Sequence, residues 1–326
     1  MTEMRDGIHS AEAPTKIILS GEHSVVYGYP AIVLAVEPKV RAEARLTGDA
    51  VVRVSSSHLG VAEYDFVSGG FKGERRLLPA LEVVRSVLET CGCRSGLTAE
   101  TFGEVPVAAG MGSSASAFVS TALATFRAAG VDPSKAQLFD AAMVGEKMVH
   151  GRPSGIDVEI AISGGAMRYV KGGESRRIGI DADLPLLVIN TGLERSTGDM
   201  VEKFRSNLES GGEEKRRLLD TMGSITENIE VALGGMDLDI IGHLMTANHC
   251  VLSSFGVSVP ALDSIVAQSI IAGATGAKLT GAGGGGSAIA LARPDLMSKI
   301  VDRMDQIGFK SFPAKLSHEG VTGWTS

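Results

Sequence analysis

Short runs of aliphatic and β-branched residues, broken by turn residues, dominate the first part of the chain. Runs of this length between turn signals such as Tyr29-Pro30 predict β-strands. These predicted strands lie at 16–19, 31–36, 40–46, 50–55 and 97–103. Further runs predict strands at 157–162, 166–170 and 185–190. The polar residues 1–12 are expected to form a loose tail.

Helix signals are interleaved with these strands and dominate after residue 195. Pro79 suits the first turn of a helix, which is expected to end at Gly92. A helix of small residues is expected from Ser113 to Gly130. The next helix has Asp132 as its expected cap and runs to about residue 149. The later helices are predicted at 198–209, 213–233, 237–254, 260–272 and 294–307.

The strand-rich front half and the helix-rich back half together predict an α+β fold in two lobes. Among the late helices, only the short runs 278–281, 287–292 and 310–317 are expected to be strands. A chain of 326 residues also exceeds the size at which a single core usually stops growing. We therefore expect an N-terminal lobe over 1–180 and a C-terminal lobe over 181–326.

The composition is that of an ordinary globular protein, with 44% hydrophobic and 21% charged residues. The formal net charge of −7 argues against nucleic acid as a partner, because such binding needs clustered Lys and Arg. It is compatible with ATP, since backbone N–H groups can bind phosphates. The 41 glycines are close to twice the usual share of about 7%, and their clustering indicates tight loops.

The cysteines and the first residues bear on the cellular compartment. Cys91, Cys93 and Cys250 suit neither a zinc site nor a disulfide framework, so free thiols in a reducing cytoplasm are expected. The N-terminus lacks the apolar segment of a signal peptide. No unbroken apolar stretch reaches the ~18 residues that a membrane helix needs. A soluble, cytoplasmic protein without a membrane partner is expected.

The segment PVAAGMGSSASAF at 106–118 has the strongest local signal. Gly110 and Gly112 allow close backbone approach to a ligand, and the serines that follow keep the first helical turn free of bulk. A helix N-terminus with exposed N–H groups binds anions. A simple serine cap would explain part of this pattern. Two glycines beside two adjacent serines favour a phosphate-binding loop, and the absence of any Gly-Lys pair excludes a P-loop.

A second glycine cluster, LTGAGGGGS at 279–287, contains the GxGxxG spacing of dinucleotide-binding proteins. That motif should open a helix, whereas the following residues, SAIALA, predict a strand. We therefore reject the dinucleotide-binding interpretation and expect a second backbone cradle here.

Glu146 falls within the apolar face of the helix predicted after Asp132. A carboxylate that points inward needs a cationic partner or a metal ion. An ion pair with Arg or Lys is one interpretation. The other is a Mg²⁺ ligand, because Mg²⁺ takes one or two protein oxygens together with nucleotide phosphates.

Asp157 follows the turn Pro153-Ser154-Gly155 at the start of a predicted strand. A carboxylate fixed in this way suits a general base, but the segment alone equally fits an Asp that caps the turn. Lys16 and the pair Glu22-His23 are ordinary polar residues when each is taken alone.

Taken together, six segments resemble the GHMP kinase superfamily and, within it, the mevalonate kinase family. The superfamily's own motifs are similar to APTKIILSGEHSVVYGYPA, PVAAGMGSSASA and KLTGAGGGGSAIAL. The segments HGRPSGID, NTGLERSTGDMV and NHCVLSSFGVSVPALD resemble mevalonate kinases in particular. The resemblance runs in order from about residue 13 to 320. Thr15, Met111 and Asn190 depart from the family's usual Gly, Leu and Asp.

The resemblance implies an N-terminal lobe like domain 2 of ribosomal protein S5 and a ferredoxin-like C-terminal lobe, often assembled as a homodimer. It also implies ATP and Mg²⁺ as cofactors. The implied acceptor is mevalonate, phosphorylated on its 5-hydroxyl in isoprenoid biosynthesis.

The same resemblance implies roles for single residues. Asp157 takes the proton from the substrate hydroxyl, and Lys16 pairs with it and steadies the developing charge. Ser114 and Glu146 bind Mg²⁺. The residues that wrap the phosphates are Val107, Ala108, Ala109, Gly110, Met111, Gly112, Ser113, Ser114, Ala115, Ser116 and Ala117. The residues that face the acceptor are Glu22, His23, Thr197, Gly281 and Ala282.

Several alternatives stay open at this point. A related GHMP kinase that acts on phosphomevalonate, on the 3-hydroxyl of mevalonate or on a sugar would share the ATP site. Galactokinases also contain the tripeptide GEH, but SVVYGYPA after it favours mevalonate. A nucleotide-binding sensor without turnover would need the phosphate loop but neither Lys16 nor Asp157, so this class is disfavoured.

Overall fold

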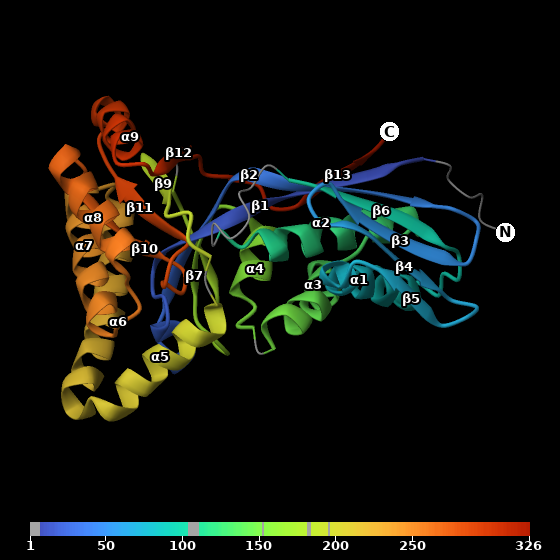
Figure 1. Ribbon diagram of the computed structural model, residues 1–326, viewed down its shortest axis with the longest axis horizontal. Coiled ribbons are helices and arrows are strands. Elements are labelled where there is room, and N and C mark those ends of the chain that lie inside the picture. Colours follow the sequence, from blue (N-terminus) through green and yellow to red (C-terminus); the bar gives the residue numbers. More distant parts are fainter. Residues whose placement is uncertain (1–6, 104–110, 152, 181–183, 195) are drawn as a thin grey trace.

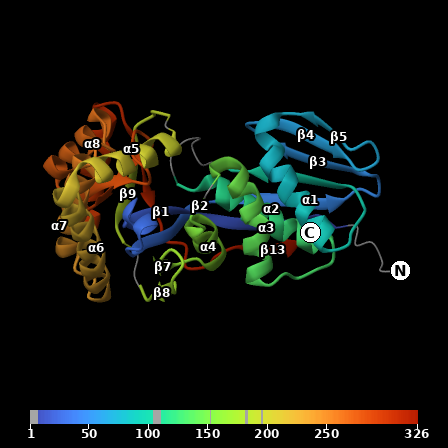
Figure 2. The same ribbon diagram turned by 90° about the horizontal axis from the view of Figure 1, so that it is seen from below.

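The computed structural model describes residues 7–103, 111–151, 153–180, 184–194 and 196–326. Its strands form two sheets that lie side by side along the long axis of the molecule (Figures 1 and 2). Helices α1–α4 cover one face of the first sheet, and α6–α8 lie beside the second. This arrangement confirms the predicted α+β class with two sheets.

The first sheet has nine strands within the described residues, in the order β13-β1-β2-β6-β3-β4-β5, with β7 paired to β2 and β8 paired to β7. Its longest strand, β2, pairs with β1, β6 and β7 and forms the spine of the sheet. The strands are β1 (His9–Ser20), β2 (Ala31–Leu46), β3 (Val51–Ser56), β4 (Gly60–Asp65), β5 (Gly70–Gly73), β6 (Leu97–Phe102), β7 (Ala166–Tyr169), β8 (Arg176–Ile178) and β13 (Thr322–Thr325).

Helix α2 is the central helix on this sheet (Figure 1). Its small residues Ala115, Ala122 and Ala124 are fully buried, which lets the helix lie close against the sheet. The helices of this part are α1 (Leu78–Thr90), α2 (Ser113–Ala128), α3 (Lys135–His150) and α4 (Ile156–Ser163), with short 3₁₀ helices at Ser24–Tyr27 and Arg75–Leu77.

The second sheet is antiparallel, with the order β10-β11-β9-β12. Its strands are β9 (Leu186–Asn190), β10 (Gly276–Thr280), β11 (Ser287–Leu291) and β12 (Lys310–Ala314). The helices around it are α5 (Thr197–Ser210), α6 (Gly212–Gly234), α7 (Leu238–Ser254), α8 (Pro260–Ala272) and α9 (Met297–Gln306), with a 3₁₀ helix at Pro294–Leu296.

An apolar cluster joins the two sheets. Ile17 of β1 and Leu34 of β2 belong to the same buried cluster as Val188 of β9 and Ile229 of α6. Burial of apolar surface across the junction fixes the position of β1 relative to the second sheet. The division of the chain at residue 180 stays a prediction.

One predicted strand is a helix in the structure. Residues 157–162 were expected to be a strand, but they form most of α4. Apolar residues at 156, 158, 160 and 162 alternate with Asp157 and Glu159, which is the pattern of a strand, and with five of its eight residues buried the helix lacks the polar face of a surface helix. Gly155, in the left-handed conformation at φ 87°, precedes the helix and lets the chain turn into it.

Other differences concern the ends and joints of elements. Residues 9–12, expected in a loose tail, belong to β1 and pair with β13. The predicted strands 31–36 and 40–46 are one continuous strand, β2. Ser134 rather than Asp132 caps α3, through a reciprocal capping box with Gln137. The sequence pattern predicted no strands for the hairpin of β4 and β5.

Within the described residues, no helix combines the length and the apolar character that crossing a membrane requires.

Candidate active site

Lys16 and Asp157 form an ion pair at the junction of β1 and α4. The Lys16 Nζ lies 3.2 Å from the Asp157 Oδ1. The lysine side chain is 7% exposed, whereas that of the aspartate is 26% exposed. The ammonium is therefore held inside the protein, and the carboxylate can meet a ligand at the surface of the site.

The turn before α4 fixes the place of Asp157. Tyr169 donates a hydrogen bond from its hydroxyl to the carbonyl of Ser154. The Phe139 ring packs so closely on Gly155 that a Cβ there would lie 2.9 Å from its Cζ. Asp157 thus stands in the first turn of a helix whose start is held by two aromatic side chains.

The start of α2 lies directly over this ion pair. Lys16 donates a backbone hydrogen bond to the carbonyl of Met111 at 2.8 Å. A Cβ on Gly112 would lie 2.9 Å from Cγ of Lys16 and 3.3 Å from Oδ2 of Asp157. The positive end of the α2 dipole therefore faces the Lys16–Asp157 pair, as an anion-binding site requires.

Gly112→Ala is expected to lower kcat/KM by about tenfold or more, because the new methyl group must displace Lys16. Gly112 has φ 67°, so alanine also costs about 1–2 kcal/mol of stability. Gly130→Ala is the matched control: its φ is 80° and no atom lies within 4 Å of the added Cβ. Thermal unfolding should show a stability loss in both variants, and steady-state kinetics should show a defect in Gly112→Ala alone. Equal kinetics in the two variants would contradict the close approach.

Glu146 of α3 is a buried carboxylate beside the pair, with 3% of the residue exposed. Its Oε1 accepts a hydrogen bond of 2.9 Å from Oγ of Ser114 in α2. Burial raises the pKa of Glu146 to about 7, and the negative charge of Asp157 adds to the rise. Among the described residues, the only basic side chain within 4 Å of this carboxylate is His150, at 3.8 Å, and burial lowers the pKa of that imidazole, which favours its neutral form.

A bound divalent cation would offset the cost of burying the Glu146 carboxylate beside Asp157. Glu146, Asp157 and Ser114 present oxygen atoms, which are the ligands that Mg²⁺ prefers. Within the described residues, no group of three His, Cys, Asp or Glu side chains forms a complete metal site. The Ser114 hydroxyl beside the Glu146 carboxylate fits Mg²⁺, which takes one or two protein oxygens and draws its other ligands from phosphates and water.

Beyond the end of β1, His23 marks a second part of the site. Its Nε2 lies 2.9 Å from the carbonyl oxygen of Ala282, and because a carbonyl only accepts, Nε2 carries the hydrogen. The imidazole also stacks on Phe204 of α5, with ring centroids 4.6 Å apart and an interplanar angle of 4°. These contacts bring β1, α5 and the loop after β10 together.

Glu22, the neighbour of His23, forms an ion pair with Lys278 of β10 in the interior. Burial raises the pKa of the Glu22 carboxyl and lowers that of the Lys278 ammonium, while the charge of each group opposes the shift of the other. The charge of Lys16 also opposes the rise in the pKa of Glu22.

Comparison with known proteins relates this geometry to a family. The chain matches the models "GHMP kinases N terminal domain" over residues 79–165 and "GHMP kinases C terminal" over 229–310. A mevalonate kinase of Thermococcus sibiricus is 35% identical over 95% of this chain and 97% of its own length. The chain belongs to the GHMP kinase family. A mevalonate kinase of Aeropyrum pernix is also 35% identical, over the same shares of the two chains.

Solved structures share the fold of this chain. A crystal structure of a mevalonate kinase superimposes with a TM-score of 0.83 at 24% identity, covering 95% of this chain and 99% of the other. The L. major mevalonate kinase in complex with R-mevalonate gives a TM-score of 0.79 at 28% identity, with 94% of each chain covered. GHMP kinases use ATP, so an ATP site is expected in this member too.

The remaining predicted site residues of this GHMP kinase differ in their exposure. Ser113, Ser114 and Ala117 are partly exposed at the start of α2, whereas Met111, Ala115 and Ser116 are buried. The Met111 side chain therefore packs in the hydrophobic core. The predicted residues Val107, Ala108, Ala109 and Gly110 lie outside the described residues.

Thr197 is exposed at the first position of α5, and this helix contacts the site through Phe204 instead. Sequence reasoning missed Phe204, His150 and Lys278. A lysine inside the apolar strand of residues 276–280 was an available signal, because a buried lysine needs an acidic partner.

The glycine loop after β10 is held closely by its neighbours. A Cβ on Gly283 would lie 2.1 Å from the carbonyl oxygen of Val257, and one on Gly284 would lie 2.6 Å from Sδ of Met200. Gly286 donates a backbone hydrogen bond to Leu193 at 3.1 Å. These glycines are thus explained by packing, and the interpretation of this loop as a second backbone cradle stays a prediction.

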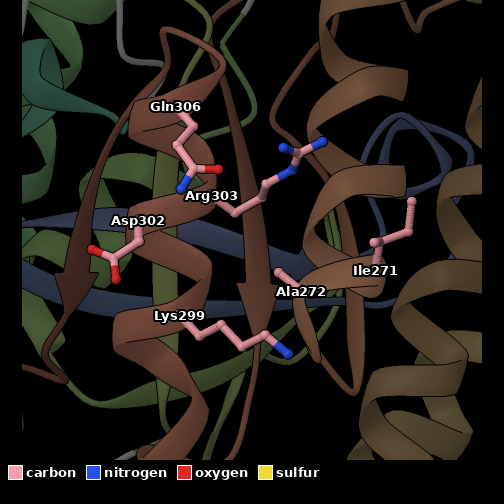
Figure 3. Close-up of a pocket in the computed structure, with 6 residues that line it drawn as sticks. All are labelled: Ile271, Ala272, Lys299, Asp302, Arg303 and Gln306. Carbon is pink, nitrogen blue, oxygen red and sulfur yellow. The ribbon is translucent and has the colours of Figure 1, made fainter.

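The pocket drawn in Figure 3 is separate from this site. Its lining comes from α8 and α9, and Arg303 there donates a hydrogen bond of 2.9 Å to Gln268. The lining residues are Ile271, Ala272, Lys299, Asp302, Arg303 and Gln306, none of which is a predicted site residue.

Proposed function

We propose that this GHMP kinase transfers the γ-phosphoryl group of ATP to the 5-hydroxyl of (R)-mevalonate. The observation that carries the proposal is the Lys16–Asp157 pair, which lies under the start of α2. The curated relatives quoted above are mevalonate kinases that cover nearly the whole chain, which supports mevalonate over other acceptors.

Asp157 acts as the general base in this proposal. Its carboxylate accepts the proton of the acceptor hydroxyl, whose oxygen then attacks the γ-phosphorus while the bond to the ADP oxygen breaks. The buried ammonium of Lys16, 3.2 Å from Oδ1, stabilises negative charge at this point. In-line phosphoryl transfer depends chiefly on positioning and charge neutralisation, and both groups are fixed by regular elements, β1 and α4.

The nucleotide is assigned to the loop before α2 and to the start of that helix, residues 107–117. N–H groups of the first turn, together with the helix dipole, bind phosphate oxygens. Ser114 and Glu146 would hold Mg²⁺, which neutralises charge on the phosphates when bound. The raised pKa of Glu146 fits this role, because a cation restores the charged form of a buried carboxylate.

The acceptor is assigned to the opposite side of the pair. Glu22, His23, Thr197, Gly281 and Ala282 are proposed to face it, and the contact between His23 and Ala282 joins two of these segments. We further propose two lobes that divide near residue 180, a homodimer and a cytoplasmic location.

A coupled ADP-release screen tests the proposed function. With ATP and Mg²⁺ in excess, turnover is expected with (R)-mevalonate and not with phosphomevalonate, galactose or homoserine. Product analysis should locate the new phosphate on the 5-hydroxyl rather than the 3-hydroxyl. Faster turnover with another acceptor would reassign the substrate, and ATP binding without turnover on any acceptor would favour the sensor.

A further inference from the structure

Three residues on and after β10 contact the end of β1. Lys278 pairs with Glu22. Thr280 accepts a hydrogen bond from the Ile18 N–H and donates one to the Ile18 carbonyl, both at 3.0 Å. The carbonyl of Ala282 accepts from His23. Every second residue from 278 to 282 thus contacts either β1, the strand that also carries Lys16, or the residues that directly follow it.

The Glu22–Lys278 pair is the most deeply buried of these contacts, with exposures of 1% and 0%. The Lys278 ammonium also donates to the carbonyl of Leu279 at 2.7 Å. The Oε2 of Glu22 has no hydrogen-bond partner among the described residues. Lys278 is therefore the side chain that holds this carboxylate in place.

The backbone around Glu22 transmits its position to His23. Gly21 has φ 97°, and a Cβ there would lie 2.4 Å from Cα of Ala31. His23 has φ 60°, which is rare for a residue other than glycine and costs about 1–3 kcal/mol. Such a turn persists only when its surroundings hold it, and the Glu22–Lys278 pair is the contact nearest in sequence to His23 that does so.

We propose that Lys278 is a positioning residue for the acceptor: it fixes Glu22, and through Glu22 the turn that presents His23 to the phosphoryl acceptor. This inference rests on the proposed function. The Lys278 ammonium is buried and bound to Glu22 and to the Leu279 carbonyl, so any effect of its removal on acceptor binding passes through Glu22. Within the described start of α2, no residue forms a hydrogen bond or an ion pair with Glu22 or Lys278, so we expect nucleotide binding to stay unchanged.

A merely stabilising ion pair would behave differently. Removal of one partner of a buried pair costs about 3–5 kcal/mol, because the other charge stays unpaired. That loss lowers the folded fraction but does not discriminate between substrates. Loss of a positioning residue does discriminate between the two substrates: the KM for the acceptor rises, and the KM for ATP stays constant.

The test compares Lys278→Met with Thr226→Val, measured on the folded fraction of the full chain. Thr226 of α6 is the matched control, because its buried hydroxyl also holds the end of β1 through a hydrogen bond, 2.7 Å from Ser20 Oγ. Lys278→Met is expected to raise the KM for mevalonate about 10–100-fold with little change in the KM for ATP. Thr226→Val should keep both constants. Equal mevalonate KM values in Lys278→Met and the wild type would overturn the proposal.

A second variant covers the case in which Lys278→Met does not fold. Glu22→Gln/Lys278→Met removes both charges and so avoids the unpaired carboxylate. Its mevalonate KM should exceed that of Glu22→Gln alone by about fivefold or more, because only the single variant keeps the hydrogen bond from Lys278. Equal values would refute the positioning role.

Hydrogen exchange distinguishes failure of this inference from failure of the proposed function. Backbone amides of residues 22–26 should exchange faster in Lys278→Met than in the wild type, whatever the acceptor is. If Lys278→Met does not fold, the double variant takes its place. In Thr226→Val the exchange rates of these amides should be unchanged. Absence of mevalonate turnover in the wild type would refute only the substrate. Unchanged exchange at 22–26 in the lysine variant would refute the role of Lys278.

Discussion

Asp157→Asn is expected to lower kcat by about 10²–10⁴-fold, because an amide cannot accept the proton of the acceptor hydroxyl. The substitution keeps the shape of the side chain, and the neutral amide still accepts a hydrogen bond from Lys16. The affinity for ATP should stay close to that of the wild type. Single-turnover kinetics at saturating mevalonate would measure the chemical step without interference from product release.

Glu159→Gln is the matched control for this variant. Glu159 lies in the same first turn of α4, so the substitution removes an equal charge from the helix start. Its carboxylate accepts a hydrogen bond of 3.3 Å from Ser163 and is not part of the Lys16–Asp157 pair. The control should retain wild-type turnover. Retention of near-full turnover by Asp157→Asn would remove Asp157 from the role of base.

Glu146→Gln is expected to change activity and stability in opposite directions. The pKa of Glu146 is raised from 4.5 to about 7 in the folded protein. Ionisation of this group therefore destabilises the fold as the pH rises from about 4.5 to 7, and the full cost is present above pH 7. With about 1.4 kcal/mol for each pKa unit, the glutamine variant without ligands should be about 1–3 kcal/mol more stable at pH 8 and nearly unchanged below pH 4.5.

The same variant should be a poor kinase. If Glu146 holds Mg²⁺, its loss raises the Mg²⁺ concentration needed for half-maximal activity and lowers kcat by about 10²-fold. Thermal unfolding with saturating Mg-ATP should then stabilise the wild type more than the variant, because a ligand stabilises the state that binds it.

Asp140→Asn on the exposed face of α3 controls for the loss of a carboxylate from this helix. A Mg²⁺ titration of Glu146→Gln that matches the wild type would return Glu146 to a structural role. A stability gain that persists unchanged from pH 8 to pH 4 would show that burial of the charge is not its cause.

The architecture was predictable where local pattern and tertiary environment agree. The helices α1, α2 and α5–α8 and the strands of the second sheet match the predicted segments within a few residues, because caps and amphipathic faces mark them. Helix α4 could not be predicted, since its apolar residues alternate with a period of two as in a strand and show no helical period. The short edge strand β13 depends on β1, a partner far away in the chain.

The candidate site was predictable as a set of residues and not as a set of contacts. Glycines and serines indicated the phosphate loop, and the position of Glu146 in an apolar helix face indicated a buried carboxylate, which the structure confirms. No local pattern could show that Glu22 meets Lys278, because 256 residues separate them. Pairing at that distance along the chain is set by the fold of both sheets.

The edge strand β13 has a consequence for biosynthesis. It completes the first sheet beside β1, and Thr325 contacts His9 across 316 residues of sequence. During translation, the outer edge of β1 therefore emerges long before its partner exists, and its backbone groups stay open to other strands. We expect the nascent chain to depend on chaperones that shield this edge, and a lengthy pause in synthesis ahead of residue 322 to promote aggregation.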